Sequence, residues 1–195
     1  MTEWRSRYVR ATNLLFERAW MLPLLGARLS ATERSLVPAH PCRVLFLCKG
    51  NICRSVFAER VALRLTGSRS GWEFRSAGLE SSPGTSSPEF AVRVAREFGV
   101  DLEAHGSRSA SPEDFSASDV AFVMEPTQRS RVRRTAGPIG PGVALLGAFC
   151  LESGPRPVIR DPFGHDVAAY RRVFEQIQEA VTAILARADS RRRHS

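Results

Sequence analysis

Residues 44–55 read Val44-Leu45-Phe46-Leu47-Cys48-Lys49-Gly50-Asn51-Ile52-Cys53-Arg54-Ser55, and the rest of the chain is organised around them. The first four residues are apolar and include two β-formers, which is typical of a short strand buried on both faces of a parallel sheet. A small polar turn follows, and residues 56–65 then carry apolar side chains at helical spacing. This order of strand, tight turn and helix N-terminus directs several backbone N–H groups at one point and predicts an anion-binding site.

The side chains of this turn are those that phosphoryl transfer needs. Cys48 ends the strand, where the amides and the helix dipole stabilise a thiolate. Arg54 should return to the rim with a planar guanidinium that matches two phosphate oxygens, and Ser55 can donate its hydroxyl to the thiolate. Asn51 can cross-brace the turn, and Gly50 permits a backbone angle that other residues resist. A nucleophilic thiolate in such a cradle predicts a covalent cysteinyl-phosphate intermediate.

The phosphoryl group is expected to bind the residues that follow the nucleophile. These are Lys49, Gly50, Asn51, Ile52, Cys53, Arg54 and Ser55. The segment lacks the nucleotide-binding pattern G-x-x-x-x-G-K-[ST]. Cys53 has two interpretations: a small apolar side chain under the loop, or a resolving thiol that forms a disulfide with Cys48 under oxidants.

Residues 48–55 resemble the signature loop C-x-G-N-x-C-R-S of the low-molecular-weight protein tyrosine phosphatases, of the bacterial type. Three further matches follow in the order of that family: Arg75-Ser76-Ala77-Gly78, Val123-Met124 and Asp161-Pro162-Phe163-Gly164. The resemblance extends from about residue 42 to residue 188. It implies a cysteine-dependent protein-tyrosine phosphatase that hydrolyses phosphotyrosine, with Cys48, Arg54 and Asp161 as the catalytic residues.

The resemblance assigns the proton transfers to Asp161. Expulsion of a phenolate-like oxygen needs a proton in the transition state, and the family's general acid occupies this Asp-Pro position. From the residues alone, an aspartate before Pro162 is more often a turn residue. After transfer, the same carboxylate would activate the water that hydrolyses the intermediate. We expect Asp166 to cap the last helix and His105 to be a structural or surface histidine rather than a base.

Two positions depart from the family pattern. Val56 replaces a proline at the start of the helix. Phe163-Gly164 lacks the tyrosines that are common in the family's acid loop, the loop that carries Asp161. The first change should matter little, because proline at the first helical position is only a preference. The second leaves open which residues recognise the substrate.

Three other functions share parts of this pattern. Thioredoxin-coupled arsenate reductases share the fold and the first loop but need a further cysteine pair downstream, and only Cys150 follows Cys53 here. Protein-arginine phosphatases carry a threonine where Ile52 stands, whereas Ile52 favours a flat aromatic substrate. A non-catalytic phosphate-binding module is the third alternative, and it would not need the complete set of groups.

The chain is strongly basic, with a formal net charge of +8 at pH 7. Lys49 is the single lysine among 28 basic residues, so the charge is carried by arginine. A basic surface favours phosphorylated, acidic or membrane-surface partners, and no arginine run with interleaved aromatic residues indicates nucleic-acid binding. The expected partner is a phosphotyrosine protein, and the resemblance suggests a tyrosine autokinase of exopolysaccharide export.

The number and spacing of the cysteines indicate which cellular compartment and which cofactors to expect. Four cysteines do not make a disulfide framework for a chain of 195 residues, and a reducing cytoplasm suits a reactive thiol. The spacing of Cys42, Cys48 and Cys53 fits no zinc pattern, so we expect no metal or organic cofactor. No run of about 20 apolar residues is present, so no membrane span is expected.

The chain divides into three parts: an N-terminal extension and linker (1–41), the phosphatase-like domain (42–188) and a basic tail (189–195). Apolar and basic residues between 4 and 20 predict one basic amphipathic helix, broken near Pro23. Three interpretations stand beside each other. The helix packs on the domain or frays, it makes peripheral contact with a membrane surface or a partner, or it precedes the true initiator at Met21.

Strands and helices alternate along the domain. Strands are expected at 44–47, 71–76, 119–124 and 142–146, and helices at 56–65, 88–98, 125–134 and 167–185. This order predicts a three-layer α/β/α fold with a four-stranded parallel sheet, right-handed crossovers and flavodoxin-like strand order. The site should lie in the crevice beyond the carboxyl ends of the strands.

Overall fold

A four-stranded parallel sheet forms the centre of the molecule. The computed structural model describes residues 3–22, 29, 31–33, 35–36, 42–67, 71–136, 141–150 and 156–192. Within them the strands are β1 (Arg43–Cys48), β2 (Glu73–Gly78), β3 (Val120–Val123) and β4 (Gly142–Leu145), in the order β2-β1-β3-β4. The predicted α/β fold with flavodoxin-like strand order is confirmed.

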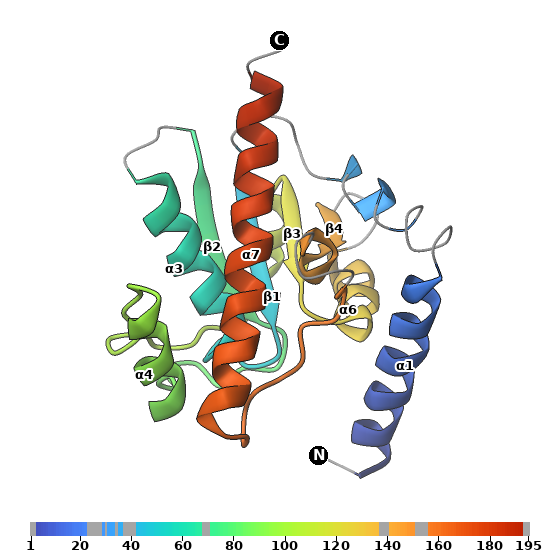
Figure 1. Cartoon of the computed structure of the whole chain (residues 1–195), viewed down its shortest axis with the longest axis vertical. Coiled ribbons are helices and arrows are strands. Elements are labelled where there is room, and N and C mark those ends of the chain that lie inside the picture. The colour runs from blue at the N-terminus through green and yellow to red at the C-terminus, as the bar shows by residue number, and fades with distance from the viewer. Residues whose placement is uncertain are drawn as a thin grey trace.

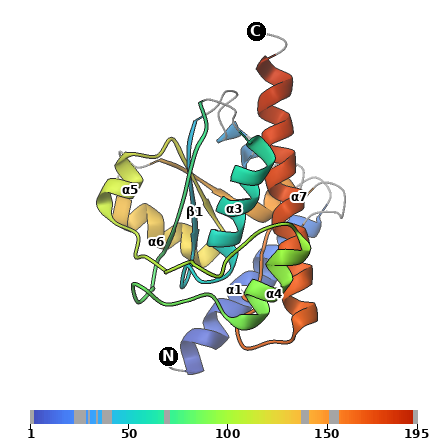
Figure 2. The ribbon, with the colours of Figure 1, turned by 90° about the vertical axis from the view of Figure 1, so that its left-hand side faces the viewer.

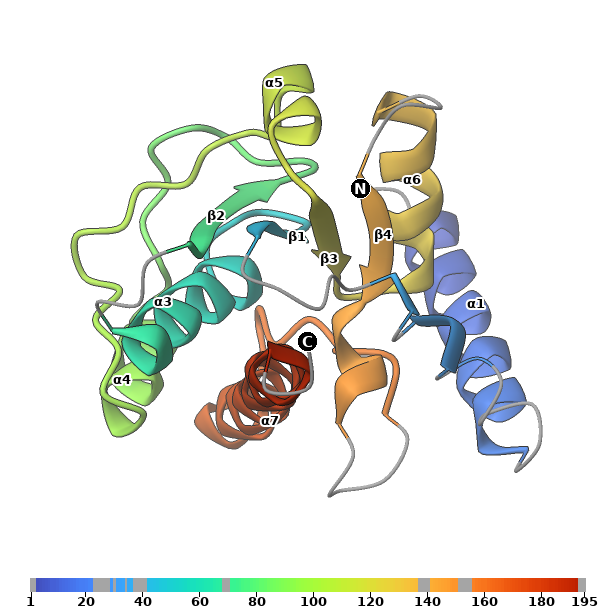
Figure 3. The ribbon, with the colours of Figure 1, turned by 90° about the horizontal axis from the view of Figure 1, so that it is seen from above.

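Helices cover both faces of this sheet (Figure 3). One face carries α3 (Arg54–Thr66), α4 (Glu89–Glu97) and α7 (Val167–Arg192), and α7 packs against α3, α4 and the short 3₁₀ turn η1 (Leu146–Phe149). The other face carries α5 (Pro112–Ser116) and α6 (Pro126–Ala136). The elements therefore form the three expected layers, in which α3 and α6 pack directly against strands, α4 packs against α7, and α5 packs against α6.

The core explains why β1 is central. Its residues from Val44 to Cys48 are all buried, and it pairs with β2 on one side and β3 on the other. Phe57 of α3 and Phe174 of α7 stack with ring centroids 3.8 Å apart, which joins the two helices above the sheet. Strands buried on both faces are expected to be continuously apolar, as β1 and β3 are.

The second strand lies two residues later than predicted. Its alternating pattern suggested 71–76, but β2 runs from Glu73 to Gly78. Pairing with β1 continues in register to the pair Cys48↔Gly78, so backbone hydrogen bonding carries the strand past its alternating residues. As a result, the end of β2 lies beside the turn that follows Cys48.

The last helix is long and capped as expected. The backbone N–H of Ala169 donates to Oδ1 of Asp166 at 2.8 Å, just before α7 begins. α7 continues to Arg192, past residue 188 where the sequence analysis ended the domain (Figure 1). Residues 189–192 therefore extend this helix.

The N-terminal helix α1 (Glu3–Met21) lies beyond β4 and packs against α6 (Figures 1 and 3). Trp20 is 1% exposed and its ring lies 5.5 Å from that of Phe16. After α1, Glu33 accepts a hydrogen bond from the backbone N–H of Leu145 at 2.9 Å, which satisfies a donor on β4. No described helix is both long enough and apolar enough to cross a bilayer.

Candidate active site

The nucleophile candidate lies where the sequence placed it. Cys48 is the last residue of β1 and α3 begins at Arg54, so the turn between them forms the carboxyl edge of the sheet. Figure 2 shows α3 running back alongside β1. The backbone N–H of Asn51 donates to Cys48 Sγ at 3.2 Å, and Ser55 Oγ lies 3.0 Å from the same sulfur. The predicted contact between Ser55 and Cys48 is therefore present.

Asn51 holds the turn in shape. Its Nδ2 donates to Ser55 Oγ at 3.0 Å and to Ser76 Oγ at 2.9 Å, and its Oδ1 accepts from the backbone N–H of Arg108 at 3.0 Å. Because Ser55 Oγ accepts from Asn51, its single proton can go either to Cys48 Sγ at 3.0 Å or to the carbonyl of Ala77 at 3.5 Å. Asn51 also has φ 54°, whereas the sequence analysis gave the unusual backbone angle to Gly50. That assignment was wrong, since a short polar side chain tolerates the left-handed region and here uses it to reach inward.

Neighbouring segments fasten the turn from outside. His105 Nε2 lies 2.7 Å from the carbonyl oxygen of Asn51, which agrees with a structural role for this histidine. At the end of β2, a Cβ on Gly78 would lie 2.6 Å from Ser81 Cβ and 3.0 Å from the carbonyl carbon of Gly50. Gly78 is therefore required for this close approach. The motif 75–78 lies at the site because it contributes both Ser76 and Gly78.

Arg54 is enclosed by other residues. The sequence predicted that it would lie on the rim of the site, and that prediction was wrong. Arg54 is 1% exposed, and its Nη1 donates to Glu125 Oε1 at 2.7 Å and to the carbonyl of Ile159 at 3.0 Å. Its Nη2 lies 2.9 Å from Asp161 Oδ2, and its Nε is buried with no partner among the described residues. Burial opposes the guanidinium charge, but the charges of Asp161, Cys48 and Glu125 raise the pKa of Arg54. The unpaired Nε is a buried donor that suits an anion.

Glu125 is a site residue that the sequence analysis missed, having placed it at the start of a helix. It follows β3, is 7% exposed, and accepts hydrogen bonds from Arg54, from Asn13 Nδ2 at 2.8 Å and from Gln128 Nε2 at 3.4 Å. Its place directly after Val123-Met124 was the available signal. Carboxyl ends of neighbouring parallel strands meet at one edge, so an acidic residue after β3 lies close to the turn after β1.

Asp161 reaches the site from the segment before α7. The backbone N–H of Ile159 donates to the carbonyl of Met124 at 2.9 Å, which ties this segment to the end of β3. Asp161 Oδ1 accepts from the backbone N–H of Phe163 at 3.3 Å, and Oδ2 pairs with Arg54. The side chain is 38% exposed. The structure thus brings the three predicted catalytic residues together, with Arg54 between the turn and the acid loop.

The other cysteines are buried thiols. Cys53 is 3% exposed, and burial together with the neighbouring Cys48 raises its thiol pKa. Cys150 Sγ donates to the carbonyl of Gln176 at 3.3 Å, and burial raises its pKa to about 12. Cys42, Cys48, Cys53 and Cys150 are all free thiols in the structure. The oxidative disulfide between Cys48 and Cys53 stays a prediction.

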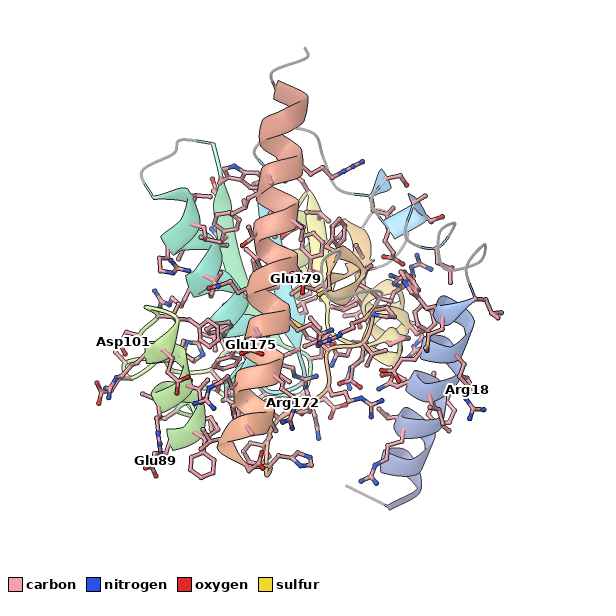
Figure 4. All side chains as sticks on the ribbon, in the orientation of Figure 1. Arg18, Glu89, Asp101, Arg172, Glu175 and Glu179 are labelled. Carbon is pink, nitrogen blue, oxygen red and sulfur yellow. The ribbon has the colours of Figure 1, made fainter. Side chains whose placement is uncertain are left out.

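A groove adjoins the acid loop on the side of α1. Its cavity volume is about 430 Å³, and its walls include Glu17 and Met21 of α1, Arg160 and Asp161 of the loop, and Arg172 of α7. Figure 4 shows Arg172 on α7 and Arg18 on the side of α1 turned away from α7. Glu17 pairs with Arg160 at 2.7 Å across the groove. Among the described residues, no group of three or more His, Cys, Asp or Glu side chains is arranged to hold a metal ion.

Comparison with known proteins gives the family. The model of the low molecular weight phosphotyrosine protein phosphatases matches residues 43–194. The low molecular weight phosphotyrosine protein phosphatase 2 of Drosophila melanogaster is 33% identical over 153 residues, covering 74% of this chain and 91% of that protein. The crystal structure of the Erwinia amylovora tyrosine phosphatase AmsI superposes with a TM-score of 0.66 at 28% identity, covering 74% of this chain and 91% of that chain.

A third relative shares the fold at lower identity. The YwlE arginine phosphatase from Geobacillus stearothermophilus superposes with a TM-score of 0.68 at 23% identity, covering 77% of this chain and 94% of that chain. At that level the likeness concerns the fold alone. The family match begins at residue 43, so α1 lies outside the matched region. On the strength of its matched residues and of the site they build, this chain belongs to the low molecular weight phosphotyrosine protein phosphatase family.

Proposed function

We propose that this protein is a protein-tyrosine phosphatase that works through a cysteinyl-phosphate intermediate on Cys48. The observation that carries the proposal is the environment of the sulfur. A main-chain N–H of Asn51 and the hydroxyl of Ser55 both contact Cys48 Sγ, and the guanidinium of Arg54 is buried with an unpaired Nε. Such donors favour a thiolate and an incoming dianion at the same place.

In the first step, the Cys48 thiolate attacks phosphorus, the S–P bond forms and the P–O bond to the tyrosine breaks. Asp161 gives its proton to the departing phenolate oxygen. Main-chain amides of residues 49–54 and the guanidinium of Arg54 stabilise the charge on the phosphoryl oxygens. Asp161 suits this role because its side chain is 38% exposed beside the site and is free to turn to the leaving oxygen once a phosphoryl group takes its place on Arg54.

In the second step, water attacks the phosphorus of the intermediate. The Asp161 carboxylate takes a proton from that water, the S–P bond breaks, and inorganic phosphate leaves. Cys48 returns as a thiolate that Ser55 stabilises by donating its hydroxyl. Every proton and bond is accounted for by these residues and water.

The turn supports tyrosine over the competing substrates. Ile52 is half-buried and packs against the apolar core, so the turn presents an apolar side chain where an arginine phosphatase carries threonine. An arsenate reductase needs two further thiols, and Cys150, buried against the carbonyl of Gln176, is the one cysteine that follows Cys53 in the chain.

The partner and the compartment are extensions of this proposal. We propose a phosphotyrosine protein of the cytoplasm, with tyrosine autokinases of exopolysaccharide export as the candidate class. Four free thiols suit a reducing compartment. Peripheral membrane contact by α1 is supported by its exposed apolar side chains Tyr8, Leu14, Leu15 and Met21. Sedimentation with anionic vesicles tests that contact separately.

Parallel assays on matched peptides test the proposed activity. Phosphotyrosine, phosphoserine and phosphoarginine peptides of one sequence context are compared with wild-type protein, with Cys48→Ser and with Cys150→Ser as the control thiol. Phosphotyrosine should be the preferred substrate, and Cys48→Ser alone should abolish its hydrolysis. Preferred hydrolysis of phosphoarginine, or retained activity in Cys48→Ser, would contradict the proposal.

A further inference from the structure

We propose that α1 is part of the catalytic site, because Asn13 positions Arg54 through the carboxylate of Glu125. This inference rests on the proposed phosphatase function and adds a positioning residue to it. Asn13 lies outside the matched region of the family, which begins at residue 43. The observations that carry it are the hydrogen bonds, the burial and the helical spacing of α1.

The two carboxylate oxygens of Glu125 bind side chains from two different helices, α3 and α1. Its Oε1 accepts from Arg54 Nη1 at 2.7 Å, and its Oε2 accepts from Asn13 Nδ2 at 2.8 Å. Gln128 Nε2, at 3.4 Å, reaches only Oε1. Because Glu125 is 7% exposed, loss of the Asn13 amide would leave a buried anionic oxygen without that donor.

The hydrogen bond to Glu125 accounts for the presence of a buried asparagine at position 13. Asn13 is 8% exposed, and its Oδ1 has no partner among the described residues. A buried amide with an unpaired oxygen costs more than an apolar side chain of similar size. A carboxylate only accepts hydrogen bonds, so the group that faces Glu125 is the Nδ2 donor. The chemistry that favours asparagine at this position is therefore the carboxylate of Glu125.

The same face of α1 also reaches the acid loop. Asn13, Glu17 and Trp20 are spaced by four and three residues, so they lie on one side of the helix. Trp20, 1% exposed, anchors this side. Glu17 pairs with Arg160 at 2.7 Å, next to Asp161 in the chain. α1 thus contacts both the carboxylate that holds Arg54 and the segment that carries the acid.

The consequence concerns the direction of the Arg54 guanidinium. Glu125 and the carbonyl of Ile159 hold Nη1, which leaves Nε and Nη2 for phosphoryl oxygens. When Glu125 loses its second anchor, its carboxylate can rotate, and the guanidinium is no longer held at one angle. Reduced binding of phosphate and of the transition state should follow, while the fold of the domain is kept.

The first test compares Asn13→Ala with Thr12→Ala in the full chain. Thr12 is the control because its Oγ1 donates only to the carbonyl of Tyr8 within α1. Asn13→Ala should lower kcat/KM for p-nitrophenyl phosphate and raise the inhibition constant of inorganic phosphate, each about tenfold. Thr12→Ala should change neither. Equal values for the two variants, at any melting temperature, would overturn the proposal.

A second variant covers the case in which Asn13→Ala is poorly folded. Asn13→Asp sets a carboxylate against Glu125, beside Gln128 and with Arg54 and Asp161 as the other charges facing the pair. The two carboxylates then compete for one proton. The deficit in kcat/KM relative to wild type should shrink as pH falls from about 8 to about 5.5. A deficit that does not change with pH would contradict a contact with Glu125.

Phosphate binding separates this inference from the proposed function. The rise in melting temperature caused by inorganic phosphate needs no turnover. A wild-type protein that is stabilised by phosphate but hydrolyses no phosphotyrosine would refute the proposed function and leave the role of Asn13 testable by the same shift. A full phosphate-induced shift in Asn13→Ala would refute the positioning role.

Discussion

Arg54 Nη2 lies 2.9 Å from Asp161 Oδ2, so the proposed phosphate-binding group and the proposed acid are paired with each other in this structure. Their side chains differ in freedom, because that of Arg54 is 2% exposed and that of Asp161 is 38% exposed. An incoming phosphoryl group therefore meets a fixed guanidinium and a carboxylate that can move. From this pair we expect an order of events: phosphate takes over Arg54, and Asp161 then turns to the leaving oxygen.

The loss of activity caused by removing the Asp161 carboxylate should depend on the leaving group of the substrate. Asp161→Ala should reduce kcat/KM by roughly 10²–10⁴-fold on phenyl phosphate, whose leaving group needs a proton, and much less on p-nitrophenyl phosphate. Asp166→Ala is the control, because Asp166 caps α7 and does not touch Arg54. The ratio of the two kcat/KM values is the measurement, because kcat also contains the hydrolysis step that both substrates share. If Asp161→Ala lowers both kcat/KM values equally, Asp161 is not the acid.

Glu125 should matter for stability as well as for activity. Glu125→Ala removes one partner of a buried pair and should lower the free energy of unfolding by about 3–5 kcal/mol. Glu103→Ala is the matched control, because its pair with Arg96 is exposed at 70% and 57% and should contribute below about 1 kcal/mol. Urea denaturation of both variants checks this. Similar losses in the two variants would contradict the buried role of Glu125.

Replacement of Asn51 by glycine and by alanine should lower the stability of the protein to different extents. Both variants lose the hydrogen bonds to Ser55, Ser76 and the backbone of Arg108. At φ 54°, alanine also carries the left-handed penalty, so Asn51→Ala should be less stable than Asn51→Gly by about 1–2 kcal/mol. Chemical denaturation measures the difference. A more stable alanine variant would mean that the backbone at Asn51 is not left-handed.

Asp114 gives the expected pH dependence of stability. Burial opposes its charge, but Arg108 Nη1 at 2.8 Å and the backbone N–H of Ser111 at 2.9 Å lower its pKa in the folded protein. Because its pKa is lower in the folded protein, the ionised Asp114 carboxylate stabilises the fold at pH values above its unfolded pKa of about 3.9. This stabilisation is lost as the pH falls through the folded pKa. Asp114→Asn should therefore cost about 1 kcal/mol near pH 7 and progressively less below about pH 4.

The measurement is the free energy of unfolding of both proteins across that range. A difference that stays constant down to about pH 3 would show that the charge of Asp114 is not what stabilises the cap.

The catalytic turn could be predicted from sequence because it is local. The strand, the nucleophile and the helix that carries Arg54 lie within one short segment, and hydrophobic periodicity with turn chemistry describes such a segment well. The parallel sheet followed from the alternation of strands and helices along the domain. The contacts of Asn51 were anticipated in kind, although its backbone angle was assigned to Gly50.

The long-range contacts could not be predicted in the same way. Arg54 and Glu125 are 71 residues apart, and Asn13 and Glu125 are 112 residues apart. Their meeting depends on how α3, β3 and α1 are placed by the core, and no local pattern encodes it. The burial of Arg54 was missed for the same reason, since the groups that enclose it come from two distant segments: Glu125 after β3, and Ile159 with Asp161 before α7.

Trapping the intermediate tests the central claim most directly. Wild-type protein and Cys48→Ala are mixed with a phosphotyrosine peptide labelled at phosphorus, quenched within one turnover, digested, and analysed by mass spectrometry. We predict one phosphoryl group on the sulfur of Cys48 in the wild type, and none on any residue of Cys48→Ala. Turnover of the peptide with the label on another residue, or with no labelled enzyme at any quench time, would contradict the account.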